Sequence, residues 1–284
     1  MDDAAKVETY YNERVAGKLG DFTACNPRIE AAVATIAEWA PWPPRRVLEI
    51  GCGVGATTWR MARAWPRAQV IGADISRTSI EVAQTCFKRR NLAYQAGLVT
   101  EASMGGPFDL VVLMDVYEHI APADRASLHA AIKSGLAERG RVIMTVPTAK
   151  MQAFLRADMP DRLQPVDEDI GLDVIATFAR ETGTELASFR QVGIWRYGDY
   201  AHLVFGRLDF DLVQVRAQPP GGMRSKVKKA LGLDPRPGRR DYLGFDVGVA
   251  RRSRRLQRFE VSPAERARLA SAWATARREA DKPQ

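Results

Sequence analysis

The stretch VLEIGCGVGATT, residues 47–58, decides the fold class of this 284-residue chain. A short strand-forming run leads into Gly51, Gly53 and Gly55, and a helix-forming run follows. Glycines are needed at such a junction because the backbone turns tightly, a ligand approaches the main chain, and the next helix packs closely on the strand. The stretch therefore predicts a buried strand, a ligand-binding loop and a helix in direct succession.

The glycine spacing by itself serves more than one class of nucleotide. GCGVGA at residues 51–56 satisfies the G-x-G-x-x-A pattern of dinucleotide-binding loops. Asp74 ends the strand-like run QVIGAD about 20 residues further on, where a carboxylate can accept hydrogen bonds from ribose hydroxyls. Both features suit NAD as well as other cofactors that contain adenosine. An NAD-dependent oxidoreductase therefore remains an alternative on these residues alone.

From Arg46 to Gly206 the chain alternates short apolar runs with amphipathic ones, which predicts a parallel sheet with helices on both faces. The last two expected strands, ELASFRQV and DYAHLVFGR, lie close enough in sequence to form an antiparallel pair at the sheet edge. We therefore predict an α/β fold with a Rossmann-like, seven-stranded, mostly parallel sheet. Strands are expected at 46–50, 69–74, 91–96, 108–116, 141–146, 185–192 and 199–207, and helices at about 55–65, from 76, 122–138 and 167–182.

The flanks of this region differ from it in pattern. We predict a helical N-terminal cap over residues 1–45, the ligand-binding domain over 46–206 and a basic C-terminal extension over 207–284. Residues 147–166 show little periodicity, and such an insertion above a sheet often shapes a substrate pocket. One late helix is expected, because Ser262, Pro263 and Glu265 form a capping box.

The net charge of +8 belongs to the C-terminal extension, where residues 216–284 hold 18 Lys and Arg against 7 Asp and Glu. Such a bias also arises from an arginine-rich genome composition. The segments MRSKVKKALGL (223–233) and ARRSRRLQRF (250–259) nevertheless suggest contact with an anionic membrane surface or with a phosphate-bearing glycan carrier. A solvated extension without a partner is the alternative hypothesis.

The sequence shows no secretory signal at its start and no apolar run near the roughly 18 residues that span a membrane. Cys25, Cys52 and Cys86 are too few and too scattered for a disulfide framework or a zinc site with paired ligands, so we expect no metal. We predict a cytoplasmic protein, with peripheral contact at the inner membrane face as a further hypothesis.

Several motifs together resemble the class I S-adenosylmethionine-dependent methyltransferases. They are E-x-G-x-G-x-G at residues 49–55, the acid at Asp74, and FDLVVLMDVYEHI at 108–120. The EHI ending and the later GRVIMTVPT resemble the small-molecule branch, which includes ubiquinone-biosynthesis O-methyltransferases and bacterial sugar and natural-product methyltransferases. The resemblance covers about residues 45–206 and implies S-adenosylmethionine as the cofactor.

The resemblance also implies roles for single residues. Glu49 and the glycine loop would face the methionine part of the cofactor, the end of the second strand would hold ribose and adenine, and the end of the fourth would flank the sulfonium. Tyr11, with Tyr10, would close over the cofactor, although ordinary helix packing explains these aromatics equally well. The residues assigned to the cofactor are Tyr11, Glu49, Gly51, Cys52, Gly53, Asp74, Ile75, Asp115 and Val116.

The sequence departs from the family after the third strand. A Gly-Asp pair often stands there and its carboxylate meets the adenine amine, whereas this chain has Gly97 beside Leu98. Adenine recognition must then use Gln95, Glu101 or a backbone group. If none of these reaches the base, cofactor affinity would be weak and the chain would be a degenerate methyltransferase.

Methyl transfer from a sulfonium depends mainly on an in-line nucleophile at near-attack distance, and such positioning can supply about 7 to 11 kcal/mol. A hydroxyl acceptor gains further from a general base. His119 is the first candidate because it follows the fourth strand at its carboxyl end. Asp115 and Glu118 are the carboxylate alternatives, His202 is a weaker candidate, and His129 is expected to meet solvent. Neither Cys52 nor Cys86 is expected to take part in chemistry.

The methyl acceptor is predicted to be a small molecule. Enzymes that methylate exocyclic amines of nucleic acids resemble one another in an N/D-P-P-Y/F motif, but residues 115–118 are DVYE and lack the prolines. The Pro-Cys pair of cytosine-C5 methylation is also absent from the sequence. We predict transfer to a hydroxyl of a sugar, a glycan or another polar metabolite. Alternatives are N-methylation of a small molecule, an NAD-dependent oxidoreductase and a non-catalytic module. The oligomeric state remains open.

Overall fold

The computed structural model describes residues 3–41, 43–207 and 255–280, and within them a single sheet has the strand order β3-β2-β1-β4-β5-β7-β6. β7 pairs antiparallel with both β5 and β6, and the other pairs are parallel. The predicted seven-stranded, mostly parallel sheet is therefore confirmed. The strands are β1 (Arg46–Ile50), β2 (Gln69–Asp74), β3 (Leu92–Ala96), β4 (Phe108–Met114), β5 (Leu136–Pro147), β6 (Glu185–Val192) and β7 (Tyr200–Gly206).

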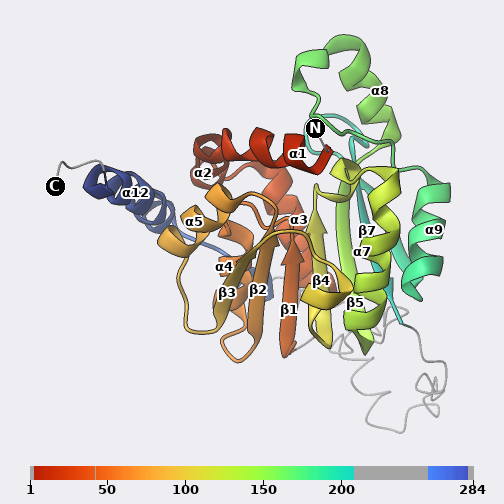
Figure 1. Cartoon of the computed structure of the whole chain (residues 1–284), viewed down its shortest axis with the longest axis horizontal. Coiled ribbons are helices and arrows are strands. Elements are labelled where there is room, and N and C mark those ends of the chain that lie inside the picture. The colour runs from red at the N-terminus through yellow and green to blue at the C-terminus, as the bar shows by residue number, and fades with distance from the viewer. Residues whose placement is uncertain (1–2, 42, 208–254, 281–284) are drawn as a thin grey trace, which may run out of the picture.

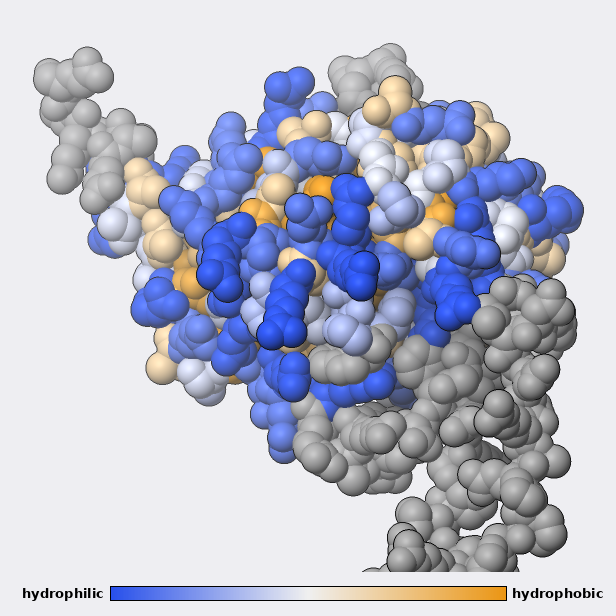
Figure 2. Space-filling model, turned by 90° about the horizontal axis from the view of Figure 1, so that it is seen from below, coloured by the Kyte–Doolittle hydropathy of each residue, from blue (hydrophilic) through white to orange (hydrophobic). Residues whose placement is uncertain are grey.

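Helices cover both faces of the sheet, while α1 and α2 lie across one end of the strands (Figure 1). Hydrophilic side chains cover most of the described surface at the opposite end (Figure 2). The helices are α1 (Asp3–Asn12), α2 (Val15–Thr23), α3 (Pro27–Trp39), α4 (Ala56–Ala64), α5 (Arg77–Cys86), α6 (Glu101–Met104), α7 (Pro122–Gly135), α8 (Ala149–Asp158), α9 (Leu172–Thr182) and α12 (Pro263–Ala280), with 3-10 turns η1 (Tyr117–His119) and η2 (Pro160–Arg162).

The core follows from the alternation of side chains along the central strands. Val47 packs with α3 and α4 on one face, whereas the next residue, Leu48, packs with α7 and α9 on the other. Leu110 and Val111 of β4 divide between the same two clusters. Because successive side chains of a strand point to opposite faces, a sheet covered on both sides needs such continuous apolar runs.

Side-chain caps begin several of the helices. Asn26 accepts a hydrogen bond from the backbone N–H of Arg28 at the start of α3, and Ser76 accepts one from Ser79 at the start of α5. The late helix is also confirmed, since α12 begins at Pro263 and Ser262 accepts the N–H of Glu265 at 3.2 Å.

Some element boundaries differ from the prediction. The segment 147–166 contains α8, which begins where the Thr148 hydroxyl accepts the N–H of Met151. Gln152 is the buried residue of that helix, so α8 lacks the apolar stripe by which helices are recognised in sequence. The helix expected from Asp167 begins at Leu172, and α7 ends at Gly135 because β5 already begins at Leu136.

The expectation that His129 meets solvent is wrong. Its side chain is buried between α7 and α9, where Nε2 lies 2.8 Å from the Tyr117 hydroxyl and Nδ1 lies 2.6 Å from Glu181 Oε2. α7 packs on α9 as well as on the sheet, so a second face of this helix is covered. His129 is therefore buried by α9, a helix that lies far from His129 in the sequence.

The C-terminal extension is described over residues 255–280, and these residues pack on the rest of the domain. Phe259 is buried in the cluster that contains Val47, while Val261 and Leu269 are buried against α2 and α5. The segment MRSKVKKALGL and the first part of ARRSRRLQRF lie outside the described residues. Within the described ranges, no helix combines the length and the apolar character needed to cross a bilayer.

Candidate functional site

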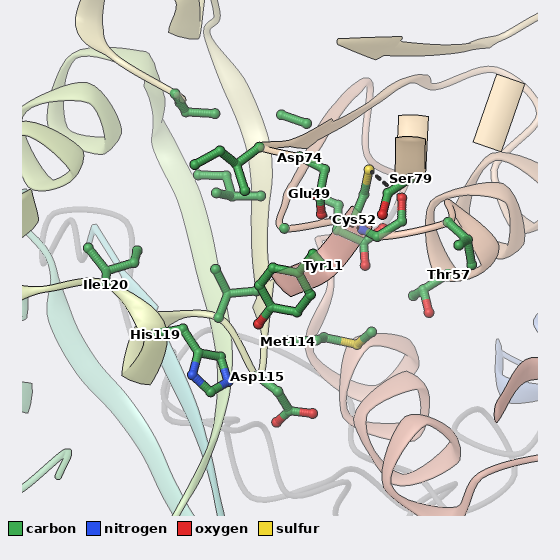
Figure 3. Close-up of a pocket in the computed structure, with 18 of the residues that line it drawn as sticks. Tyr11, Glu49, Cys52, Thr57, Asp74, Ser79, Met114, Asp115, His119 and Ile120 are labelled. Carbon is green, nitrogen blue, oxygen red and sulfur yellow. Dashed lines mark hydrogen bonds between the residues drawn. The ribbon is translucent and has the colours of Figure 1, made fainter. Parts of the chain in front are cut away.

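A pocket of about 320 Å³ lies at the carboxyl ends of β1, β2 and β4. The strand order reverses between β1 and β4, and open parallel sheets bind ligands at such a switch point. Every residue that the sequence assigned to the cofactor lines this pocket: Tyr11, Glu49, Gly51, Cys52, Gly53, Asp74, Ile75, Asp115 and Val116. In Figure 3, Glu49, Cys52 and Asp74 gather on one side, Asp115 and His119 on the other, with Tyr11 between them.

The glycine loop needs its glycines for both conformation and space. Gly51 has φ +72° and Gly55 has φ +82°, in the left-handed region that L side chains rarely adopt. A Cβ atom at Gly51 would stand 2.2 Å from a methyl group of Val116, and one at Gly55 would stand 2.6 Å from the Tyr94 hydroxyl. The loop therefore brings its backbone close to the end of β4 on one side and to β3 on the other.

Asp74 connects the end of β2 to the glycine loop. Its Oδ2 accepts the N–H of Gly53 at 2.7 Å, and its Oδ1 accepts the N–H of Ser76 at 2.9 Å. Burial raises the pKa of this carboxyl. Because each carboxylate oxygen can accept more than one hydrogen bond, both oxygens keep capacity for ribose hydroxyls.

Glu49 is buried in β1 and faces the same pocket. The hydroxyl of Thr58 in α4 donates to its carboxylate. Burial raises the pKa of Glu49 to about 8, so the carboxyl is largely neutral at pH 7. A ligand cation beside it would favour the ionised form.

Cys52 occupies a confined position and is not suited to nucleophilic chemistry. A Cβ atom added at Gly72 would lie 2.9 Å from its sulfur, which shows how closely β2 approaches this side chain. Burial raises the pKa of the Cys52 thiol well above its ordinary value, so the thiolate is disfavoured.

Residues 97–100, which follow β3, line the part of the pocket where the family resemblance would place adenine. Neither Gln95 nor Glu101 is among the pocket-lining residues, although both were candidates for adenine recognition. The Thr100 hydroxyl caps α6 by accepting the N–H of Ser103. Of the options raised by the sequence, backbone groups of residues 97–100 are therefore the ones placed at the pocket.

Two cations that sequence reasoning missed reach the pocket from the N-terminal cap. Arg28 of α3 forms an ion pair with Asp115 after β4, and Lys18 of α2 lies beside them. Although burial opposes its charge, Asp115 raises the pKa of the Arg28 guanidinium. Burial, and then the charge of Arg28, lower the pKa of Lys18. The local sequence indicates only that α3 begins at the Asn26 cap, two residues before Arg28. It does not indicate that Arg28 points into the pocket.

Asp115 has an unusual backbone conformation at the end of β4. Its φ is +53°, a left-handed value that is uncommon for residues other than glycine. The side chain accepts a hydrogen bond from the Thr145 hydroxyl at 3.2 Å in addition to the ion pair with Arg28. Strained residues of this kind cluster at binding sites, where surrounding contacts hold them in place.

His119 is held in one tautomer at the pocket wall. Its Nδ1 lies 2.8 Å from the carbonyl oxygen of Val166, which can only accept, so Nδ1 carries the proton and Nε2 keeps its lone pair. Burial lowers the pKa of the ring below its ordinary value of 6.5. His119 is thus neutral at pH 7 and able to accept a proton at Nε2.

The other histidine and carboxylate candidates have different surroundings. Glu118 is buried outside the pocket lining, and burial, then Asp115, raise the pKa of its carboxyl well above the usual value. Its Oε1 lies 3.6 Å from His119 Nε2. His202 points toward α3, where Nδ1 lies 2.7 Å from the Thr35 hydroxyl, and burial lowers its pKa to about 4.

The insertion after β5 contacts the pocket at two points. The Tyr11 hydroxyl donates to Gln164 Oε1 at 2.7 Å, and the carbonyl of Val166 holds His119. Tyr11 and His119 also contact each other edge to face, with ring centroids 6.4 Å apart. The N-terminal cap and the insertion therefore meet above the end of β4.

Comparisons with known proteins find methyltransferases among the similar sequences. A methyltransferase domain family matches residues 47–140. The ubiquinone biosynthesis O-methyltransferase of Ralstonia nicotianae is 30% identical over 168 residues, which cover 55% of this chain and 69% of that protein. The enzyme of the same name from Mesorhizobium japonicum is 40% identical over 87 residues, 30% of this chain and 34% of that protein. The chain thus spans about a third of the length of some curated relatives.

Solved structures share the fold at low sequence identity. Magnesium protoporphyrin IX methyltransferase from Synechocystis, with bound S-adenosylhomocysteine, has a TM-score of 0.56 at 20% identity and covers 73% of this chain and 100% of its own. An S-adenosylmethionine-dependent methyltransferase from Anabaena variabilis has a TM-score of 0.57 at 14% identity, covering 72% and 95%. The glycine loop alone suits NAD equally well, but with the similarity to the Ralstonia enzyme it shows that the chain belongs to the class I S-adenosylmethionine-dependent methyltransferases.

Proposed function

We propose that this protein transfers a methyl group from S-adenosylmethionine to a hydroxyl of a small polar molecule, and that His119 accepts the hydroxyl proton. The observation that carries the proposal is the fixed tautomer of His119, whose basic Nε2 belongs to a side chain on the wall of the cofactor pocket. Among acceptors with such a hydroxyl, we propose a sugar or a glycan.

The charges of the pocket support this placement of the cofactor. S-Adenosylmethionine carries one carboxylate and two cationic groups, the ammonium and the sulfonium. Lys18 and Arg28 are suited to the carboxylate, Glu49 to the ammonium, and Asp115 to the region of the sulfonium. Asp74 is suited to the ribose, since its oxygens keep acceptor capacity.

The chemistry then requires little beyond positioning. The cofactor supplies a methyl group that is already activated by the sulfonium. The acceptor oxygen forms a bond to the methyl carbon as the carbon–sulfur bond breaks, and the electron pair stays on sulfur to give S-adenosylhomocysteine. His119 takes the proton from the acceptor hydroxyl at Nε2, on a pocket wall that also includes Tyr11 and Val116.

Polar side chains on the pocket wall support the proposal of a polar acceptor. Asp124 and Ser127 of α7 line the pocket, and both side chains are exposed. Such groups can hydrogen-bond a polyhydroxyl compound, and a site built for those bonds rejects analogues that lack them. N-methylation of a small amine remains the second candidate, because an ammonium acceptor must also lose a proton before attack.

A turnover screen tests the proposal. S-Adenosylhomocysteine formation would be followed with sugars, nucleotide sugars, phenols and amines as acceptors. Turnover with hydroxyl acceptors supports the proposal, and turnover with amines alone would replace it by N-methylation. Cofactor binding without turnover on any acceptor would favour the non-catalytic alternative.

The raised pKa of Glu49 predicts that cofactor affinity depends on pH. The ligand ammonium favours ionised Glu49, so binding releases a proton as long as the pH lies below the Glu49 pKa of about 8. The Kd for S-adenosylmethionine is expected to fall about tenfold from pH 6 to pH 7. Calorimetry in buffers of different ionisation enthalpy would measure both the Kd and the released proton.

Glu49→Gln is the matched control for this linkage. It keeps the size of the side chain and cannot ionise, so the Kd is expected to be weaker and nearly constant over the same pH range. An equally steep pH dependence in Glu49→Gln would assign the proton to another group.

We further propose that the basic segment at residues 223–233 contacts an anionic membrane or glycan-carrier surface, a hypothesis that rests on sequence because the segment lies outside the described residues. Deleting residues 216–284 would not test it cleanly, since Phe259 belongs to the core. The better test compares the full chain with a Lys226→Ala, Lys228→Ala, Lys229→Ala variant in co-sedimentation with anionic vesicles. Equal binding by both forms would end the hypothesis.

A further inference from the structure

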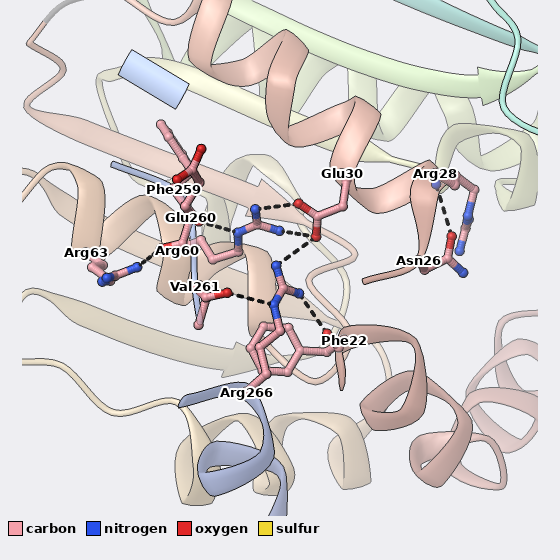
Figure 4. Close-up of polar contacts among 10 residues, drawn as sticks. All are labelled: Phe22, Asn26, Arg28, Glu30, Arg60, Arg63, Phe259, Glu260, Val261 and Arg266. Atoms are coloured by element: carbon pink, nitrogen blue, oxygen red, sulfur yellow. Dashed lines mark hydrogen bonds and ion pairs between the residues drawn. The ribbon is translucent and has the colours of Figure 1, made fainter. Parts of the chain in front are cut away.

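A cluster of charged side chains joins the C-terminal segment to the N-terminal cap. In Figure 4 the guanidinium groups of Arg60 and Arg266 converge on the carboxylate of Glu30. Arg60 donates to both carboxylate oxygens at 2.9 and 2.8 Å, and Arg266 donates to one of them at 3.0 Å. Three elements that are far apart in sequence, α3, α4 and α12, therefore meet at one carboxylate.

Both arginines are buried and bonded further to backbone carbonyls. Arg60 is 1% exposed and Arg266 is 3% exposed. Arg60 Nε donates to the carbonyl of Phe259 at 2.8 Å, and Arg266 donates to the carbonyls of Phe22 at 2.7 Å and Val261 at 3.2 Å. Such complete bonding is needed, because removing one partner of a buried charge leaves the other uncompensated.

The residues held by this cluster border the cofactor pocket. Phe22, whose carbonyl accepts from Arg266, lines the pocket from the end of α2. Glu30 lies on α3 between the pocket-lining residues Ile29 and Ala32, and Arg60 follows Ala56 and Thr57 by one turn of α4. Arg266 itself is not among the pocket-lining residues. The C-terminal segment is thus hydrogen-bonded to α2, α3 and α4, and each of these helices contributes residues to the pocket wall.

We propose that Arg266 is a positioning residue for the cofactor: by tying the end of α2 and the start of α3 to α12, it keeps the N-terminal cap closed on the glycine-loop side of the pocket. This inference rests on the proposed binding of S-adenosylmethionine in that pocket. It gives the C-terminal segment a role in affinity although none of its described residues, 255–280, lines the pocket.

The cap matters for affinity because it carries the two cations of the pocket. Lys18 lies on α2 one turn before Phe22, and Arg28 lies on α3 two residues before Glu30. When the bonds from Arg266 to Phe22 and Glu30 are lost, both helices lose their shared anchor. Lys18 and Arg28, the two cations suited to the cofactor carboxylate, would then be displaced together, which weakens binding without removing any contacting side chain.

Arg266→Ala and Arg266→Lys test the proposal in the full chain, with Arg268→Ala as the matched control on an exposed position of the same helix. Calorimetric titration with S-adenosylhomocysteine is expected to show a Kd about tenfold higher for Arg266→Ala. Arg266→Lys keeps the charge but not the planar fork, so it can satisfy one acceptor at a time and should fall between the two. Arg268→Ala should stay within twofold of the parent protein.

Two further measurements distinguish displacement of α2 and α3 from a general loss of folding stability in the Arg266 variants. If more than nine-tenths of the protein is folded at the titration temperature, unfolding alone cannot raise the apparent Kd by even a quarter. Hydrogen exchange in the ligand-free proteins should show faster exchange of α2 and α3 in both Arg266 variants, with β1 and β4 unchanged. If Arg266→Ala does not fold, Arg266→Lys decides by the same two readouts.

The outcomes distinguish this inference from the proposed function. Unchanged Kd and unchanged exchange of α2 and α3 in the Arg266 variants would overturn the positioning role. If the parent protein binds no S-adenosylhomocysteine, the proposed cofactor placement fails, and unequal exchange between Arg266→Ala and Arg268→Ala still reports on the anchor itself. Exchange that rises equally in cap and sheet would mean a general loss of stability and would also contradict the proposal.

Discussion

His119→Ala is expected to lower kcat about 10²- to 10⁴-fold, the usual contribution of a positioned acid or base, while the Kd for S-adenosylhomocysteine stays within about twofold. The reason is that Nε2 of this ring holds the available lone pair, whereas the bond from Nδ1 to Val166 only orients it. Single-turnover kinetics with a hydroxyl acceptor, together with calorimetry, would measure the two effects separately.

The pH dependence of the same reaction checks the role of His119. The ring must be neutral to accept a proton, and burial lowers its pKa below 6.5. At saturating S-adenosylmethionine we therefore expect kcat/KM for the acceptor to be constant above about pH 7 and to fall as the pH drops through a value below 6.5. His119→Ala should lack this acidic limb.

Glu118→Gln is the matched control for His119→Ala, because the carboxyl of Glu118, the residue next to His119, is expected to be neutral already. Its buried position and raised pKa mean that glutamine replaces a protonated acid of nearly the same shape. Turnover within about threefold of the parent protein is expected. A large loss in Glu118→Gln with little loss in His119→Ala would reverse the two roles.

Asp74→Ala is expected to raise the Kd for S-adenosylmethionine about ten- to hundredfold, which corresponds to losing a charge-assisted hydrogen bond of roughly 1.5 to 3 kcal/mol. The loss has two sources. The ribose loses its acceptor, and the N–H groups of Gly53 and Ser76 lose the carboxylate that holds the loop and the start of α5.

Asp74→Asn separates these two sources. The amide oxygen can still accept one of the two backbone N–H groups, so the loop is held in part, but the charge toward the ribose is gone. An intermediate Kd is expected in titration calorimetry. A Kd unchanged from the parent protein in Asp74→Ala would contradict the ribose assignment, whatever happens in Asp74→Asn.

Much of the site follows from local patterns. The strand, glycine loop and helix of residues 47–58 form as predicted because the same few residues satisfy the turn, the close approach and the packing. Asp74 reaches the loop because parallel strands end at one edge of a sheet, and β2 pairs with β1. The pocket position follows from the reversal of strand order.

Other contacts could not be predicted because no local pattern encodes them. Arg28 and Asp115 are separated by 87 residues, and Tyr11 and Gln164 by 153. Arg28 lies on a helix that, in sequence, is simply an amphipathic lead-in. Its direction into the pocket depends on how α3 crosses the sheet. The burial of His129 depends in the same way on α9, which supplies Glu181.

The amino-acid sequence alone was sufficient to predict the α/β class, the antiparallel strand pair at the sheet edge, and the glycine loop with its neighbouring residues. These features are predictable because periodicity and backbone requirements act over a few neighbouring residues. The tertiary structure alone revealed which distant side chains complete the pocket and that the basic C-terminal extension is partly core. Arg266 and Glu30, 236 residues apart, illustrate the difference. In sequence Arg266 is one of many basic residues, and its pairing is decided only where α12 packs on α2 and α5.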